Sequence, residues 1–162
     1  MGGEFLSLDP LSLLLAKKKT LTESNLKLIK CFKEKWGGST YDAIVESHLM
    51  MERELADFLA ESHRVTRSYA ISKAMIHDGA FDVITFDQAQ EMSLFPLGKP
   101  EDKEEFVVVI GDPTDETVLK FLNENLSAFQ YAVSEKKTIR DAILKYFPIT
   151  SQLPNLKESG HG

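Results

Sequence analysis

Apolar residues recur every three or four positions along the first sixty residues, and this spacing is typical of helices that bury one side. A first helix is predicted to start at Asp9-Pro10, since aspartate can cap a helix and proline tolerates the first helical position. A second is predicted from Thr22, with an apolar face of Leu26, Ile29, Phe32 and Trp36, and an end at Gly37-Gly38. Two further helices are predicted over residues 39–48 and from about Met51.

The pattern changes after Arg64, where short apolar runs separated by turn residues indicate strands. Strands are predicted over residues 94–97, 106–110 and 128–133, with possible short helices over 71–76 and 86–92. A helix opening is predicted at residues 112–116, and a last helix is predicted to be capped by Ser134 and ended by Pro148. The expected fold class is α+β: a small N-terminal helical bundle over residues 1–66, a compact β-β-α-β-α subdomain over 67–147, and a linker or tail over 148–162.

Composition narrows the classes of function. The net charge of −6 argues against a nucleic-acid binder, since dense phosphate contact requires a concentrated basic surface. The lone Cys31 excludes an intrachain disulfide and suits a reducing compartment. No stretch reaches the roughly 18 apolar residues that a membrane-spanning helix needs. A cytoplasmic protein without direct membrane insertion is therefore expected.

Motifs that would carry catalysis are missing from the sequence. It contains neither G-x-x-x-x-G-K-[ST] nor a G-x-G-x-x-G at a strand–helix junction, so no nucleotide cradle is predicted. Gly111 precedes a helix, but Asp112 and Asp115 fill that helix N-terminus with negative charge, which favours a capped helix over a phosphate site. The histidines have no metal-ligand spacing. We expect no catalytic residue, no cofactor and no metal.

Lysines cluster over residues 17–35, and Lys27, Lys30 and Lys33 recur every three residues on one helix side. This side is either an ordinary solvated helix face or a docking face for an acidic partner or an anionic membrane. The leucine-rich start, comprising Phe5, Leu6, Leu8 and Leu11, is likewise either core or a partner-facing patch. These seven residues are the candidate partner-binding set.

Several segments of the chain follow a known family pattern in order. In the helical part these are residues 21–26 and 51–60. In the second part they are residues 95–98 and 106–110, Gly111-Asp112-Pro113-Thr114-Asp115, and residues 139–146. On these segments, residues 10–147 resemble the N-terminal, MshE-type domain of bacterial type II secretion and type IV pilus assembly ATPases. This resemblance implies a non-catalytic adaptor, placed before an ATPase motor domain in cis. The adaptor would dock that motor onto the cytoplasmic domain of an inner-membrane platform protein, so that it lies peripheral to the inner membrane.

Some members of that family bind cyclic di-GMP through a repeated arginine-leucine-glycine motif. Aligned on Leu26, the motif arginines and glycines fall on Pro10, Ser12, Lys19, Ser39, Tyr41 and His48 in this chain. Since lysine does not replace a planar arginine fork, we predict no cyclic di-GMP binding of the family kind. A nucleotide sensor that regulates the motor, and a stand-alone regulator of the same fold, remain the alternative hypotheses.

Overall fold

The computed structural model describes residues 8–18 and 20–148, and its contacts divide the chain into two compact units. The first unit is Met1–Leu55 and the second is Ala56–Gly162. The division lies within helix α5 (Glu52–His63), whereas the sequence placed the boundary between residues 66 and 67. The two units are described separately below.

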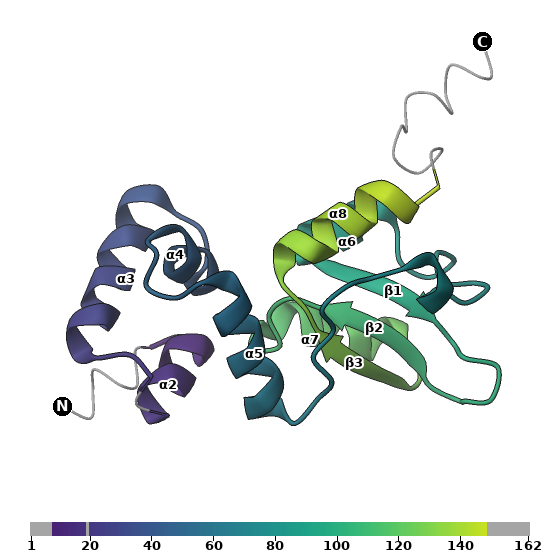
Figure 1. Cartoon of the computed structure of the whole chain (residues 1–162), viewed down its shortest axis with the longest axis horizontal. Helices are drawn as coiled ribbons and strands as arrows, with labels where there is room; N and C mark the ends of the chain where they lie inside the picture. Colours follow the sequence, from purple (N-terminus) through teal and green to yellow (C-terminus); the bar gives the residue numbers. More distant parts are fainter. Residues whose placement is uncertain (1–7, 19, 149–162) are drawn as a thin grey trace, which may run out of the picture. The chain divides into compact units, whose positions relative to one another are not determined.

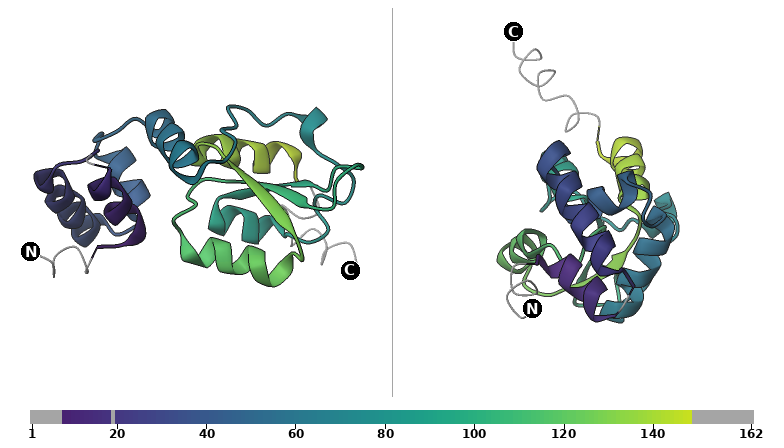
Figure 2. Two further views of the ribbon diagram at one scale, coloured as in Figure 1. Left: turned by 90° about the horizontal axis from the view of Figure 1, so that it is seen from below. Right: turned by 90° about the vertical axis from the view of Figure 1, so that its left-hand side faces the viewer.

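The first unit consists of helices that pack against one another (Figures 1 and 2). They are α2 (Pro10–Lys17), α3 (Glu23–Trp36) and α4 (Thr40–Glu46), followed by the first turn of α5. Each of the three begins where the sequence predicted, because a polar side chain caps its first turn: Asp9 for α2, Thr22 for α3 and Ser39 for α4. The caps satisfy backbone N–H groups that have no partner within the helix.

The core of the first unit is formed by side chains from all of these helices. Its fully buried members are Leu11, Leu15, Ile29, Tyr41, Ala43, Ile44 and Leu55. The buried Tyr41 ring has a polar end, and its hydroxyl donates a hydrogen bond of 2.8 Å to Oε2 of Glu52. A buried tyrosine hydroxyl needs such a partner, so this bond fixes the start of α5 beside α4.

The second unit follows the predicted β-β-α-β-α order (Figure 1). The α+β fold class is therefore confirmed. After the rest of α5, its elements are η1 (Lys73–Met75), α6 (Phe86–Met92), β1 (Leu94–Gly98), β2 (Phe106–Ile110), α7 (Glu116–Asn125), β3 (Phe129–Val133) and α8 (Lys136–Tyr146). The sheet order is β1-β2-β3, with β1 antiparallel to β2 and β2 parallel to β3. Helices α6 and α8 lie side by side and both contact β1.

An aromatic cluster closes one part of the second core. The ring of Phe147 lies 4.6 Å from that of Phe81, 5.9 Å from that of Phe86 and 6.0 Å from that of Phe95, measured between centroids. These separations suit edge-on and tilted aromatic packing. Phe147 is only 3% exposed, so the chain returns to the core after α8 ends and before Pro148.

Two helix starts differ from the prediction, in which Asp112 caps the helix that follows β2 and Ser134 caps the last helix. Helix α7 begins at Glu116 with Asp115 as its cap, because the Asp112 carboxylate instead accepts from the backbone N–H of Thr114 and forms a local turn. Helix α8 has Glu135 at its N-cap position, without a side-chain cap bond, rather than Ser134. Ser134 is fully buried, and its hydroxyl has no hydrogen-bond partner among the described residues.

Candidate docking surface

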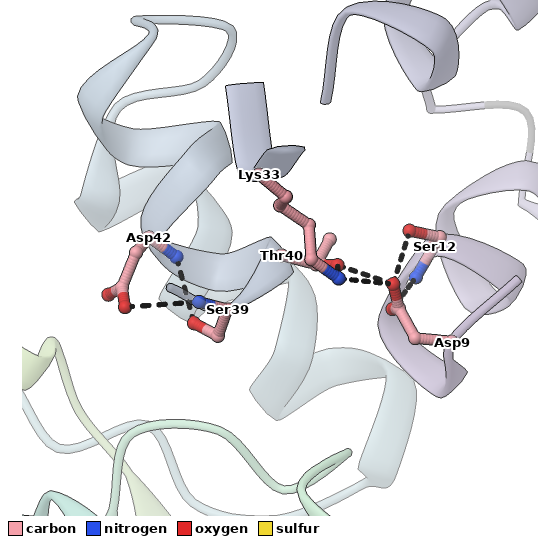
Figure 3. Close-up of polar contacts among 6 residues, drawn as sticks. All are labelled: Asp9, Ser12, Lys33, Ser39, Thr40 and Asp42. Carbon is pink, nitrogen blue, oxygen red and sulfur yellow. Dashed lines mark hydrogen bonds and ion pairs between the residues drawn. The ribbon is translucent and has the colours of Figure 1, made fainter. Parts of the chain in front are cut away.

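A polar cluster around Asp9 ties together the three helices of the first unit (Figure 3). One carboxylate oxygen of Asp9 accepts from the backbone N–H of Ser12 at 2.9 Å and caps α2. The other accepts from the Ser12 hydroxyl at 3.0 Å, from Nζ of Lys33 on α3 at 3.3 Å, and from the hydroxyl of Thr40 on α4. Lys33 also donates to Thr40 at 3.0 Å. One carboxylate thus joins α2, α3 and α4.

The electrostatics of this cluster favour the ionised form of Asp9. Burial alone would raise its pKa, but the hydrogen bonds from Ser12 and Thr40 and the positive charge of Lys33 together outweigh burial. The pKa of Asp9 therefore lies below its ordinary value of 3.8. The cluster is a charged structural junction at neutral pH.

The three predicted lysines do not share one environment. Lys27 and Lys30 are exposed to solvent, whereas Lys33 is half-buried in the Asp9 cluster. Lys33 therefore serves the packing of the first unit, and only Lys27 and Lys30 present their charges freely at the surface. Exposure and positive charge are also what lysines on an ordinary solvated helix face have, so these two properties alone do not indicate a binding site.

The predicted apolar patch divides in the same way. Phe5 and Leu6 lie outside the described residues, Leu8 is half-buried, and Leu11 is only 2% exposed. Leu11 therefore belongs to the core rather than to an accessible surface.

Three large apolar side chains in the described part of the first unit are exposed instead: Met51, just before α5, and two residues on α3. Trp36 is 67% exposed and Leu28 is 51% exposed, although the sequence pattern assigned Trp36 to the same face as the buried Ile29. Leu28 and Trp36 were missed as surface residues. The signal that pointed to them is their spacing of four from Phe32, which forms a second apolar row beside the core row.

The segment Gly111-Asp112-Pro113-Thr114-Asp115, which carries part of the predicted resemblance, lies in the second unit. It connects β2 to α7, with Gly111, Asp112 and Pro113 buried. Burial raises the pKa of Asp112, against the opposing effect of its bonds to Thr114. The motif builds a tight strand-to-helix turn, and its buried carboxylate makes the site unsuitable for a phosphate.

Two cavities lie in the second unit. One of about 190 Å³ is lined by Gln90, Ser93, Arg140 and Ile143. A second, of about 310 Å³, lies beside Phe81 and Tyr146. The described residues contain no group of three or more acidic, cysteine or histidine side chains placed to hold a metal ion. Over the same residues, no helix has the length and apolar character needed to cross a membrane.

Comparison with known proteins identifies the fold. No protein-family model matches the sequence, and no curated protein is detectably similar to it. Among solved structures, MshE, determined with cdg, matches with a TM-score of 0.64 and 19% identity over 86% of this chain and 100% of that chain. The N-terminal domain of XpsE matches in two crystal forms. The first has a TM-score of 0.64 and 15% identity over 86% of this chain and 94% of that one; the second has 0.56 and 16% over 83% and 92%. The chain therefore has the fold seen in MshE and in the N-terminal domain of XpsE, which confirms the predicted resemblance at the level of the fold.

Proposed function

We propose that this chain is the N-terminal adaptor region of a type II secretion or type IV pilus assembly ATPase. The observation that carries the proposal is the fold match, which extends over 86% of this chain and over at least 92% of each of the three matched chains. In this role the chain performs no chemistry itself. It positions the ATPase motor in cis by holding the cytoplasmic domain of an inner-membrane platform protein, and it lies in the cytoplasm beside that membrane.

The first unit is the part proposed to make this contact. Its helices are held by the Asp9 cluster and by the buried core, so they present a preformed surface with little to order on binding. It also carries exposed apolar side chains, Leu28 and Trp36, next to Lys27 and Lys35, which form no ion pair among the described residues. Protein interfaces combine an apolar centre with a polar rim in this way.

A pull-down tests the proposal. The full chain is immobilised, and the cytoplasmic domain of the platform protein from the same secretion or pilus system is passed over it. Retention of that domain, and not of an unrelated acidic protein of similar size, is the expected result. Lack of retention by a chain whose circular dichroism shows intact helices would count against the adaptor role.

A nucleotide sensor is the second candidate, because MshE was determined with cdg, which is c-di-GMP. Two features of this chain argue against it. Tyr41, at a motif glycine position, is 1% exposed and bonded to Glu52, and Ser12, at another, is 3% exposed and bonded to Asp9. These side chains fill the places where a glycine would let a ligand approach the backbone. Titration of the chain with cyclic di-GMP separates the candidates, since micromolar binding would favour the sensor.

A further inference from the structure

Helix α3 carries an apolar row that is not needed for the core of the first unit. Leu28, Phe32 and Trp36 follow one another at intervals of four residues and therefore form one ridge on the helix surface. Leu28 and Trp36 are 51% and 67% exposed, and Phe32 is half-buried between them. The rings of Phe32 and Trp36 lie 6.4 Å apart, so the end of the row is one aromatic surface. We call these three residues the apolar row.

A basic row lies directly beside the apolar row. Lys27, Cys31 and Lys35 occupy the neighbouring ridge, again at intervals of four residues, and all three are exposed. Nζ of Lys35 lies 5.2 Å from the centroid of the Trp36 ring, which places the charge at the edge of the apolar row. Neither Lys27 nor Lys35 forms an ion pair within the described part of the chain.

The opposite side of the apolar row is anchored to the core. Ile29 is 2% exposed, and Lys33, one turn further along the same ridge, is bonded to Asp9 and Thr40. This anchoring prevents α3 from rotating to bury the apolar row. Lys30 lies on yet another ridge, with Leu26 and Glu34, away from the apolar row. The helix thus presents one fixed apolar strip with positive charge along one border.

We propose that the apolar row and the basic row together bind an acidic amphipathic helix of a protein partner. This inference rests on the proposed adaptor function and identifies the chemistry of the partner. The partner's apolar side chains would pack on Leu28, Phe32 and Trp36, as in ridge-and-groove helix packing. Lys27 and Lys35 are eight residues apart, or about 12 Å along the helix at 1.5 Å per residue. Acidic side chains seven or eight residues apart on the partner helix match that separation.

Charge geometry favours such a helix over an anionic membrane. A membrane surface would attract every exposed lysine of α3, including Lys30, because its charge is spread over a plane. A helix docked on the apolar row reaches only the lysines on the bordering ridge. Lys30→Glu is therefore a positional control, since it reverses one lysine charge on the same helix but on a different ridge.

The first test measures the affinity of the full chain for the platform protein's cytoplasmic domain by isothermal titration calorimetry. Trp36→Ala, and the double change Lys27→Glu with Lys35→Glu, are each expected to weaken binding at least tenfold, while Lys30→Glu changes it less than twofold. Because these side chains are exposed, melting temperatures close to that of the wild type are expected for all variants. Equal affinities for the wild type and these variants would overturn the inference while leaving the adaptor function standing.

If the wild type fails to bind the platform protein's cytoplasmic domain, that result refutes the adaptor function alone. A second test, which does not use that domain, then judges the inference. The probe is a synthetic amphipathic helical peptide with glutamates seven residues apart, compared with its lysine-substituted counterpart. Trp36 is the chain's only tryptophan, so its emission reports directly on the apolar row. A blue shift with the acidic peptide, at least tenfold weaker binding of the basic peptide, and alkylation of Cys31 slowed by the acidic peptide are expected. An equal response to both peptides, no response, or a response only to anionic vesicles would overturn the inference.

Discussion

Asp9 provides the sharpest test of how the first unit is held together. In Asp9→Ala, α2 loses its cap, which is the bond from the Ser12 backbone N–H at 2.9 Å. Loss of such a cap costs about 1 kcal/mol. The bonds from Thr40 and Lys33 to the ionised carboxylate are also lost. Because the side chains of Asp9 and Lys33 are each about a third exposed, these bonds together contribute about 1 kcal/mol to the free energy of unfolding. The expected loss is about 2 kcal/mol.

The assay is urea unfolding of the full chain, followed by circular dichroism at 222 nm. Asp9→Asn is the matched control, since its side-chain oxygen keeps the cap and only the charge is removed, so it should lose about 1 kcal/mol. The wild type should have a higher free energy of unfolding than Asp9→Asn, and this advantage of the wild type also depends on pH. Because the pKa of Asp9 is lower in the folded chain than its ordinary value of 3.8, this advantage is complete at pH 7 and disappears as the pH falls through that lowered pKa.

Two results would refute this reasoning. If Asp9→Ala unfolds at the same urea concentration as the wild type, the Asp9 cluster does not stabilise the helices. If the advantage of the wild type over Asp9→Asn persists unchanged to pH 2, the stabilising species is not the ionised carboxylate.

Three further predictions concern the second unit and are measured by urea unfolding of the full chain. Asp112→Asn removes a buried carboxylate whose pKa is raised by burial. Because ionisation of this carboxylate destabilises the folded wild type as the pH rises, the free energy of unfolding of the variant relative to that of the wild type should increase from pH 4 to pH 7. A relative gain that is largest at pH 4 would contradict this. Gly111→Ala would place a Cβ 2.5 Å from Cγ of Lys136 and should lower the free energy of unfolding by about 1–2 kcal/mol. Most of this loss should be recovered when Lys136→Ala is added. An equal loss in the double variant would show that the clash is not the cause. Gly98→Ala combines a φ of +89° with a Cβ 3.1 Å from the carbonyl oxygen of His77, so a loss of about 1–2 kcal/mol is expected, and wild-type stability would contradict the strain.

The helix starts of the first unit could be predicted from the sequence because the interactions that cause them are local. Asp9, Thr22 and Ser39 each bond to a backbone N–H three residues later, so residue type and spacing contain the whole interaction. The apolar β-branched run of β2 was legible for a similar reason, since a buried strand needs apolar side chains on both faces.

Features that depend on residues far apart in the sequence could not be predicted. Lys33 reads as one of three equivalent surface lysines, and only the fold brings it to Asp9, 24 residues earlier in the chain. Helical spacing placed Trp36 with Ile29, but how far the buried side of α3 extends is decided by the helices that pack on it. Residues 66–68 pair with the end of β3 through bonds to Val133, although they show no apolar alternation. Such pairing is set by the backbone groups of an edge strand rather than by side chains.

The central claim is that this chain holds a protein rather than a nucleotide, and calorimetry tests both in one buffer. The full chain is titrated with the platform protein's cytoplasmic domain and, separately, with cyclic di-GMP. The adaptor account predicts saturable heat with the protein domain and none above dilution with the nucleotide. Saturable heat with the nucleotide and none with the protein domain would contradict it.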